Sequence, residues 1–163
     1  FDPVRPYGAQ FRDTLKSHGR YDARRFAADA EEALGRLGLT DPCRLLACRP
    51  YELSGGMNQR MAMALSLLLG QRVLLADEPT SALDAVLRLQ MARELKNLSR
   101  SGGMAQVVVT HDLALAQFLA DTLAVLHEGR FVEYGPADAV LRTPGPYTRR
   151  LLEAVPRLKG GSL

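Results

Sequence analysis

The chain has 163 residues, of which 47% are apolar, and a formal net charge of +3. This length and apolar content suffice for a single domain with a buried core. The sequence contains no uncharged apolar run of the ~18 residues that a membrane span needs, and its start does not resemble a signal peptide.

The net charge comes from the last sixteen residues, which hold four basic residues and one acidic residue. The rest is neutral overall, which argues against a nucleic-acid-binding surface in the core. The two cysteines, Cys43 and Cys48, lack further cysteines or a suitably spaced His. They are interpreted as buried or loop thiols in a reducing cytosol, with no zinc or iron–sulfur site.

Two helices are expected in the first forty residues. The chain opens with Phe1-Asp2-Pro3 and no initiator Met, so we expect it to continue upstream. The first helix runs from Gly8 to His18. The second is capped by Asp22 and closed by Gly38, and its apolar residues recur at helical spacing.

The stretch from Leu53 to Arg60 opens the most apolar helix of the sequence. Ser54 is a good N-cap, and the helix is expected to end at Gly70. The first turn of a helix leaves amides without intrahelical partners, and Gly55 and Gly56 carry no Cβ to keep a ligand away. A phosphate is therefore expected against these amides and the Ser54 hydroxyl. The alternative is a plain helix start beneath a loop.

The apolar run at residues 72–76 and the Val-rich segment at 105–110 predict parallel strands that are buried on both faces. A helix capped by Asp84 is expected between them, from residue 85 to about residue 99. After a further helix at residues 113–120, strands 122–127 and 130–134 are expected to be joined by a tight turn. Two short helices, 137–142 and 147–154, complete the prediction. This order indicates an α/β layer with parallel strands.

Both buried strands end in groups that can do chemistry. Asp77 and Glu78 follow the first strand, and His111 follows the second. Adjacent residues on an extended chain point opposite ways, so the two carboxylates can take different roles. We assign Asp77 to Mg²⁺, which takes one or two carboxylates together with substrate phosphates. We assign Glu78 to the attacking water, which it polarises as a general base or at least orients. The alternatives are a helix cap or turn for the acids and a structural or solvated histidine.

Four motifs in order resemble those of the ATP-binding cassette (ABC) ATPases. Residues 53–60 resemble the signature motif, residues 73–78 the Walker B motif with its catalytic glutamate, and residues 81–84 the D-loop, while His111 stands where the family has its switch histidine. The resemblance implies an α/β fold, the C-terminal part of a P-loop NTPase-type parallel sheet with an N-terminal ABC helical subdomain. The implied division is a helical subdomain at 1–70, the ATPase core at 71–135 and an importer-type C-terminal region at 136–163.

The resemblance also implies roles for individual residues. Glu78 and His111 would be catalytic and Asp77 would hold Mg²⁺. The residues implied in binding ATP, across a dimer with a second ABC ATPase subunit, are Ser54, Gly55, Gly56, Gln59 and Asp84.

The segments 129–135 and 143–158 resemble the C-terminal region of the oligopeptide, dipeptide and nickel importer ATPases. Those relatives usually read Thr-Pro-x-His-Pro-Tyr-Thr, whereas this chain reads Thr-Pro-Gly-Pro-Tyr-Thr without the histidine. The tail also lacks the cysteines with which some relatives bind an iron–sulfur cluster. The implied partners are membrane-spanning permease subunits and, indirectly, an extracytoplasmic substrate-binding protein, with no nucleic acid. The implied location is the cytoplasmic face of the membrane.

The printed residues contain no Gly-x-x-x-x-Gly-Lys-[Ser/Thr] loop to cradle phosphates. We therefore expect an ATP hydrolase in the full-length family member and no ATPase activity from this chain alone. Two alternatives stay open. One is a degenerate module that lends only its signature face to a complete partner; the other is a non-transport ABC ATPase acting on DNA or ribosomes.

Overall fold

The computed structural model of the chain describes residues 1–102 and 104–154. Contacts between Cα atoms divide it into two compact units, Phe1–Val109 and Thr110–Leu163. These units do not test the division at residues 70 and 135, which stays a prediction.

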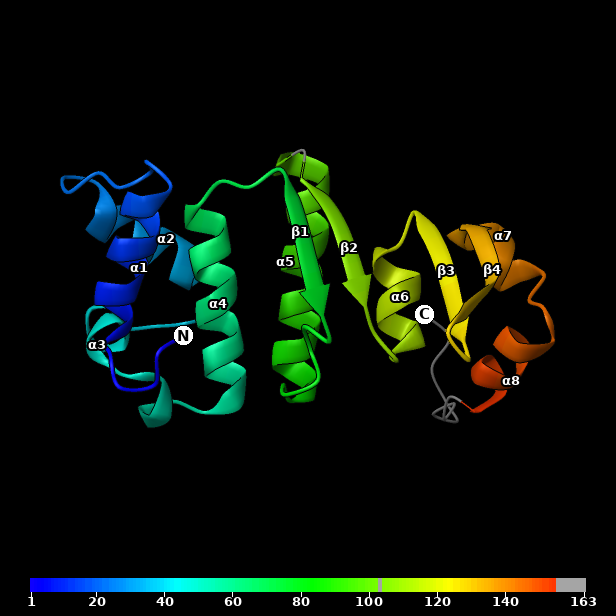
Figure 1. The fold of residues 1–163 in the computed structure, drawn as a ribbon. Coiled ribbons are helices and arrows are strands. Elements are labelled where there is room, and N and C mark those ends of the chain that lie inside the picture. The colour runs from blue at the N-terminus through cyan, green and yellow to red at the C-terminus, as the bar shows by residue number, and fades with distance from the viewer. Residues whose placement is uncertain (103, 155–163) are drawn as a thin grey trace. The chain divides into compact units, whose positions relative to one another are not determined.

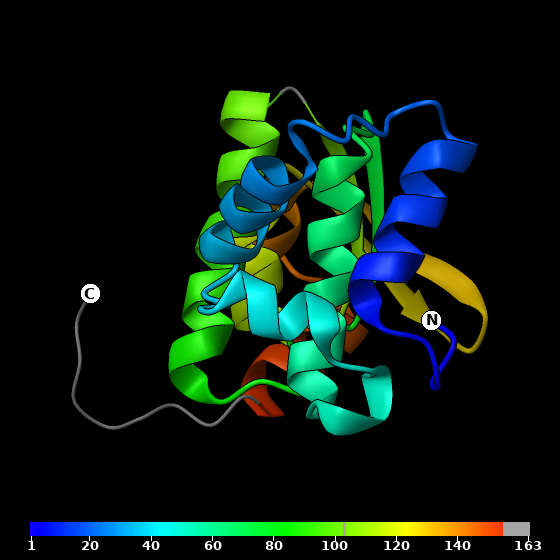
Figure 2. The same ribbon diagram turned by 90° about the vertical axis from the view of Figure 1, so that its left-hand side faces the viewer.

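The first unit begins with a helical layer (Figures 1 and 2). Its elements are α1 Tyr7–Ser17, α2 Phe26–Arg36, α3 Pro42–Ala47, the 3-10 turn η1 Pro50–Glu52, and α4 Gly55–Leu68. Side chains from three of the helices, among them Phe11, Leu34 and Met61, are completely buried and form a common core. The helices predicted at 8–18 and 55–70 are confirmed to within two residues at either end.

The prediction for α2 was right in its end and wrong in its cap. The helix closes before Gly38, whose φ of +68° is the left-handed conformation expected after a helix C-terminus. Its N-cap, however, is Arg25, which makes no side-chain capping bond. Asp22 instead accepts a hydrogen bond from the backbone N–H of Arg24, 2.8 Å away, and so stabilises the turn before the helix.

Two elements were not predicted, α3 and η1. Asp41, with a φ of 63°, caps α3 by accepting a bond from the Arg44 amide at 3.1 Å, and Pro42 occupies the first turn. A proline in the first turn is a signal for the start of a helix.

The rest of the first unit is a strand, a helix and a strand. β1 (Val73–Asp77) and β2 (Ala105–Val109) pair in parallel, with Leu75 opposite Val107 and Asp77 opposite Val109. The helix α5 (Ala85–Gly102) runs alongside both strands (Figure 1). It buries Met91 and Leu95, and the Gln106 side chain of β2 donates to the Leu95 carbonyl at 2.6 Å. The parallel pairing confirms the prediction.

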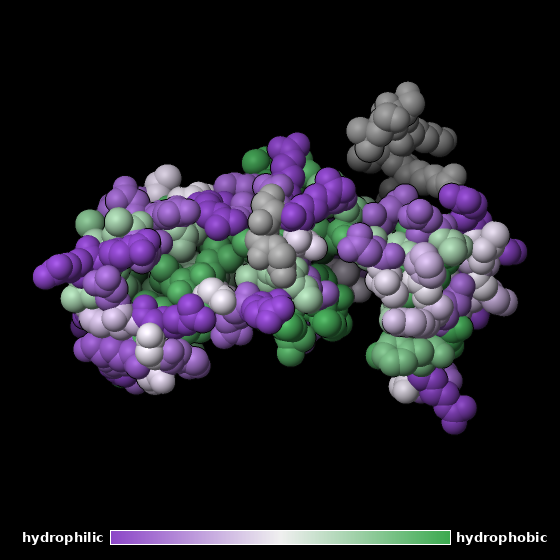
Figure 3. All heavy atoms as spheres, turned by 90° about the horizontal axis from the view of Figure 1, so that it is seen from above, coloured by the Kyte–Doolittle hydropathy of each residue, from purple (hydrophilic) through white to green (hydrophobic). Residues whose placement is uncertain are grey.

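The prediction that both strands are buried on both faces is wrong. Alternate residues are exposed on one face of the pair: Val73 is 52% exposed, Leu75 75%, and Val107 and Val109 each 57%. Residues of the opposite face are half-buried. In Figure 3, hydrophobic residues lie at the surface in the part of the molecule that contains these strands. A uniformly apolar strand is buried only where a second layer packs on it, and the described residues of this unit supply that layer on one face.

The second unit contains α6 Leu113–Leu119, β3 Thr122–His127, β4 Arg130–Pro136, α7 Ala137–Arg142 and α8 Pro146–Ala154. β3 and β4 pair antiparallel, and the turn between them places Glu128 and Gly129 at φ values of 48° and 74°. Positive φ at both positions is the conformation of the tight hairpin turn that the sequence predicted. Among the described residues, none of the helices has the length and apolar character needed to cross a membrane.

Candidate functional site: the start of α4 and the end of β1

The start of α4 is open on one side. The Ser54 hydroxyl accepts a hydrogen bond from the Met57 amide at 3.3 Å, which makes Ser54 the N-cap as predicted. Ser54 and Gly55 are exposed, and a Cβ added at Gly55 would have no heavy atom within 4 Å. An anion therefore has room to approach the first-turn amides and the positive end of the helix dipole.

The next glycine faces the protein. Gly56 is buried, and a Cβ added there would lie 2.7 Å from the Ala82 carbonyl oxygen and 2.9 Å from a methyl carbon of Leu83. The missing side chain thus lets α4 lie directly against residues 81–84. The two segments that the sequence analysis singled out separately are in contact.

The end of β1 brings two acids to the sheet edge. Asp77 is the last residue of the strand and is exposed, whereas Glu78 is half-buried. The extended chain expected at both residues is not observed, because Glu78 has a φ of 48°. This conformation starts a turn in which the Ser81 amide donates to the Glu78 carbonyl at 3.2 Å.

Gln59 links this turn to α4. Its side-chain Nε2 donates to the carbonyl oxygen of Glu78 at 2.7 Å. The structure therefore brings Gln59 and Glu78 together, although they are 19 residues apart in the sequence. It places the amide of Gln59 against the chain's own backbone, three residues past the glycines.

Asp84 caps α5, as predicted. Its carboxylate accepts bonds from the amides of Val86 and Leu87 at 3.0 and 2.9 Å. The same carboxylate acts on Arg60: burial lowers the pKa of this guanidinium, and the charge of Asp84 acts in the opposite direction. Asp84 is therefore both a cap and a counter-charge in the first unit.

Sequence reasoning missed three residues that hold α4 in place. The buried guanidinium of Arg60 donates to the carbonyls of Leu37, Gly38 and Gly56. The Tyr7 hydroxyl donates to the side-chain oxygen of Asn58. The amide of Asn58 in turn donates to the Pro50 carbonyl at 3.0 Å. For Asn58 and Arg60, their position as polar residues inside an apolar helix is the signal that could have found them, because such groups need internal partners.

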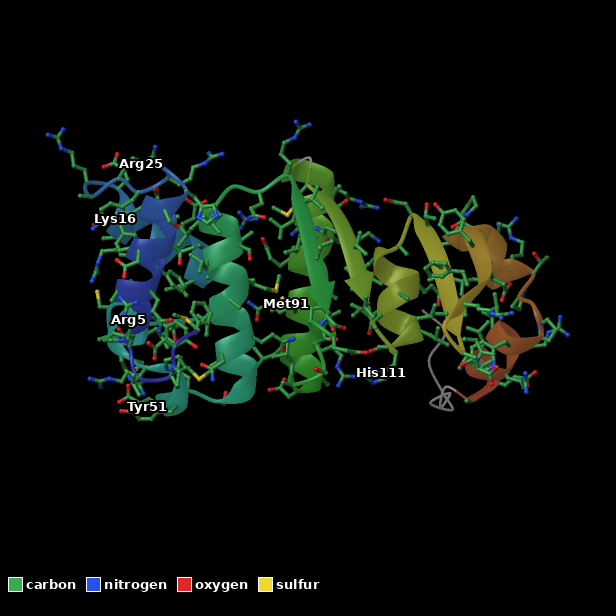
Figure 4. All side chains as sticks on the ribbon, viewed as in Figure 1. Arg5, Lys16, Arg25, Tyr51, Met91 and His111 are labelled. Atoms are coloured by element: carbon green, nitrogen blue, oxygen red, sulfur yellow. The ribbon has the colours of Figure 1, made fainter. Side chains whose placement is uncertain are left out.

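His111 belongs to the second compact unit, where it lies two residues before α6 and is exposed. Figure 4 labels it on its own segment. Next to it, Asp112 caps α6 by accepting bonds from the amides of Ala114 and Leu115. The catalytic role of His111 stays a prediction.

The end of β1 offers one exposed carboxylate, that of Asp77, as a candidate metal ligand. In the described part of the chain, no group of three or more His, Cys, Asp or Glu side chains is placed to enclose a metal. The exposed carboxylate of Asp77 nevertheless suits Mg²⁺, which keeps several waters and uses few protein ligands. A cleft of about 230 Å³ lies elsewhere, between α2 and the end of α4, and includes none of the predicted site residues.

The tail of the second unit has an anchor that the sequence did not reveal. The Glu133 carboxylate of β4 accepts bonds from the Gly145 amide, at 2.8 Å, and from the hydroxyl of fully buried Thr148. A Cβ at Gly145 would lie 3.1 to 3.2 Å from that carboxylate. The altered Thr-Pro-Gly-Pro-Tyr-Thr segment thus serves here to fix the start of α8.

Comparison with known proteins extends these observations. A family profile described as ABC transporter matches residues 7–81, the span that runs from α1 through the signature helix to the turn after β1. The chain is 42% identical over 154 residues to the nickel import ATP-binding protein NikD of Rhodospirillum rubrum. The matched region covers 94% of this chain and 59% of that protein. The chain belongs to the ABC transporter ATPase family.

A further relative and a solved structure also match the chain. The dipeptide transport ATP-binding protein DppD of Escherichia coli is 38% identical over 158 residues, covering 95% of the chain and 48% of that protein. The ATP-binding cassette MJ0796, solved as a post-hydrolysis dimer bound to ADP and Pi, superposes with a TM-score of 0.73 at 29% identity, over 83% of this chain and 58% of that one. The predicted α/β class and the ABC resemblance are confirmed. This ABC chain spans about half the length of the curated relatives it matches.

Proposed function

We propose that the longer protein to which this chain corresponds is the ATP-binding and ATP-hydrolysing subunit of an ABC importer for oligopeptides, dipeptides or nickel. It would couple ATP hydrolysis to transmembrane transport. One observation carries the proposal: an open helix start at Ser54 and Gly55 lies on the same unit as the acids at the end of β1, joined to them by the bond from Gln59 to Glu78.

Each residue of the site has a proposed role. The Ser54 hydroxyl and the amides of Gly55 and Gly56 bind the terminal phosphate of ATP held by a second ATPase subunit. Asp77 holds Mg²⁺, which neutralises charge on the phosphates when bound. Glu78 takes a proton from the attacking water and His111 contacts the terminal phosphate. Asp84 keeps the loop at residues 81–84 at the nucleotide interface by capping α5.

The proposal includes the assembly around the chain. Residues 1–70 form the helical subdomain, residues 71–135 the second half of the ATPase core, and residues 136–163 the importer-type tail. A second ABC ATPase subunit completes the nucleotide sites. Permease subunits span the membrane and bind the ATPase at the cytoplasmic face of the membrane. A substrate-binding protein on the other side of the membrane delivers the transported substrate to the permease subunits. Nucleic acid is not a partner.

The test uses the full-length protein with its permease subunits. Glu78→Gln is expected to abolish ATP hydrolysis while leaving ATP bound, because the general base is lost and the binding groups remain. Ser54→Arg is expected to abolish both hydrolysis and transport, since a bulky side chain would fill the open helix start. Ala62→Arg is the matched control, because Ala62 is an exposed residue further along the same helix.

Two measurements decide the outcome, phosphate release and uptake of labelled peptide or Ni²⁺ into vesicles. Loss of both in Ser54→Arg with both retained in Ala62→Arg supports the proposal. Hydrolysis that continues in Glu78→Gln, or uptake unchanged in Ser54→Arg, contradicts it.

A further inference from the structure

The side-chain amide of Gln59 contacts the backbone of the first unit at the turn after β1. Its Nε2 lies 2.7 Å from the Glu78 carbonyl oxygen, and its Oε1 is a buried atom without a hydrogen-bond partner among the described residues. A buried, half-satisfied amide costs free energy, so its position needs a reason other than packing alone.

The reason lies in the backbone of Glu78. Its φ of 48° is in the left-handed region, which residues with a Cβ rarely adopt. Such a conformation persists only where the surroundings hold it, and it is concentrated at functional sites. The backbone of Glu78 is held by hydrogen bonds on both sides of its Cα. Its N–H donates to the Val109 carbonyl at 2.8 Å, and its carbonyl accepts three hydrogen bonds.

The three donors to this carbonyl come from two places. Two belong to Ser81, whose amide and hydroxyl lie 3.2 and 3.0 Å away within the same turn. The third, at 2.7 Å, is Gln59 and comes from α4. Among the described residues, Gln59 is therefore the donor that ties the left-handed turn to the signature helix. The group that fills this place must be a donor, because an acceptor oxygen facing the carbonyl would repel it.

We propose that Gln59 is a positioning residue: by holding the carbonyl of Glu78 it fixes the direction of the Glu78 carboxylate relative to the start of α4. This inference rests on the proposed function, in which Glu78 is the general base, and it gives Gln59 a positioning role in place of direct contact with nucleotide. The direction of a side chain follows from the backbone that bears it, and a misplacement of about 1 Å can reduce a rate by about 100-fold.

The first experiment measures the linkage without nucleotide. Amide hydrogen exchange is followed in the nucleotide-free full-length protein and in Gln59→Met, which keeps the side-chain volume and removes the donor. The amides of Glu78 and Ser81 are expected to exchange about three- to tenfold faster, while the amide of Leu34 in the core of α2 is unchanged. Ser66→Ala is the control, because it removes an exposed side-chain bond to Ala62 on the same helix.

The conservative variant Gln59→Glu gives a pH-dependent readout. The introduced carboxyl can donate to the Glu78 carbonyl only when it is protonated, and burial beside a carbonyl oxygen raises its pKa. Protection factors of the Glu78 and Ser81 amides are therefore expected to be near wild type at about pH 5 and to fall as the pH rises to about 8. General loosening of the core would not reverse with acid.

The second experiment measures ATP turnover. Gln59→Met is expected to lower kcat about tenfold or more and to leave KM for ATP within about twofold, because the base is displaced and the binding groups are not. Unchanged kcat together with unchanged protection overturns the inference. A rise in KM without a fall in kcat also overturns it, since that result would place Gln59 in nucleotide binding.

Failure of the inference and failure of the proposed function are separable. If the wild-type protein does not hydrolyse ATP, the proposed function fails, and the exchange measurements still decide whether Gln59 holds Glu78. If the wild-type protein hydrolyses ATP and the variants match it in both readouts, only the inference fails.

Discussion

The neighbouring glycines at 55 and 56 face different surroundings, and this difference is the sharpest residue-scale feature of the site. Both were predicted from sequence as a pair that removes Cβ atoms from a ligand's path. In the structure the two have separate roles, because Gly55 opens to solvent, whereas Gly56 lets α4 pack against Ala82 and Leu83. The sequence motif located the pair of glycines. Which glycine is open to solvent and which is packed depends on the contact with Ala82, which lies 26 residues after Gly56 in the sequence.

Alanine at these two positions should therefore have different effects. We expect Gly56→Ala to destabilise the chain by about 1–3 kcal/mol, because its Cβ would overlap backbone and side-chain atoms of the 81–84 segment. Gly55→Ala should change the free energy of unfolding by less than about 1 kcal/mol. Urea unfolding followed by circular dichroism measures both. Equal destabilisation by the two variants would contradict the packing described for Gly56.

At the scale of elements, the sequence predicted what local chemistry decides and missed what packing decides. The helices at 8–18 and 55–70, the hairpin turn at Glu128 and Gly129, and the cap at Asp84 all follow from signals within a few residues, and they are confirmed. The helix α3 was missed although Pro42 marks its start. The prediction that β1 and β2 are buried on both faces was wrong. An apolar sequence makes burial of a strand favourable, but burial also requires a second layer of structure that packs on the strand.

The exposed face of β1 and β2 predicts self-association of the 163-residue chain. Leu75 and Val107 are paired across the two strands and are 75% and 57% exposed, and apolar patches of this kind drive association. We expect a mass that rises with concentration, and a return toward the monomer mass in the double variant Leu75→Lys, Val107→Lys. Light scattering after size-exclusion chromatography measures the mass. Val86→Lys, at a residue of α5 that is 77% exposed, is the control and should leave association unchanged.

The start of α8 depends on a second element, β4. Glu133→Ala would leave the buried Thr148 hydroxyl without its acceptor, which costs about 1–3 kcal/mol. We expect the backbone amides of α8 to exchange faster in this variant than in the wild type. Hydrogen exchange followed by mass spectrometry measures the difference. Glu153→Ala, an exposed residue of the same helix, is the matched control. Equal exchange in the two variants would show that Glu133 does not anchor the helix.

At the scale of the whole molecule, the proposed site is composite, because the helix start at Ser54 and the acids at Asp77 and Glu78 would serve different nucleotides. The geometry agrees with this division: Ser54 and Gly55 open to solvent, while Gln59, on the same helix, turns inward to the Glu78 carbonyl. Under the proposed function, one chain would present its open helix start to a partner and keep its acids for its own nucleotide. Sequence motifs located both halves, but which half serves which nucleotide is a property of the assembly.

Two inactive variants of the full-length protein should therefore rescue each other when the partner is a second copy. Ser54→Arg damages the site that a subunit lends, and Glu78→Gln damages the site that it keeps. In a mixed dimer one nucleotide site combines the intact Glu78 of one copy with the intact Ser54 of the other. We expect equal amounts of the two proteins, each inactive alone, to recover about a quarter of wild-type ATP hydrolysis, because about half of the dimers are mixed and each has one intact site. Recovery that depends on mixing identifies two copies of one chain as the unit that hydrolyses ATP. No recovery after exchange of subunits, verified by mass spectrometry of the dimers, would exclude a composite site formed between two copies.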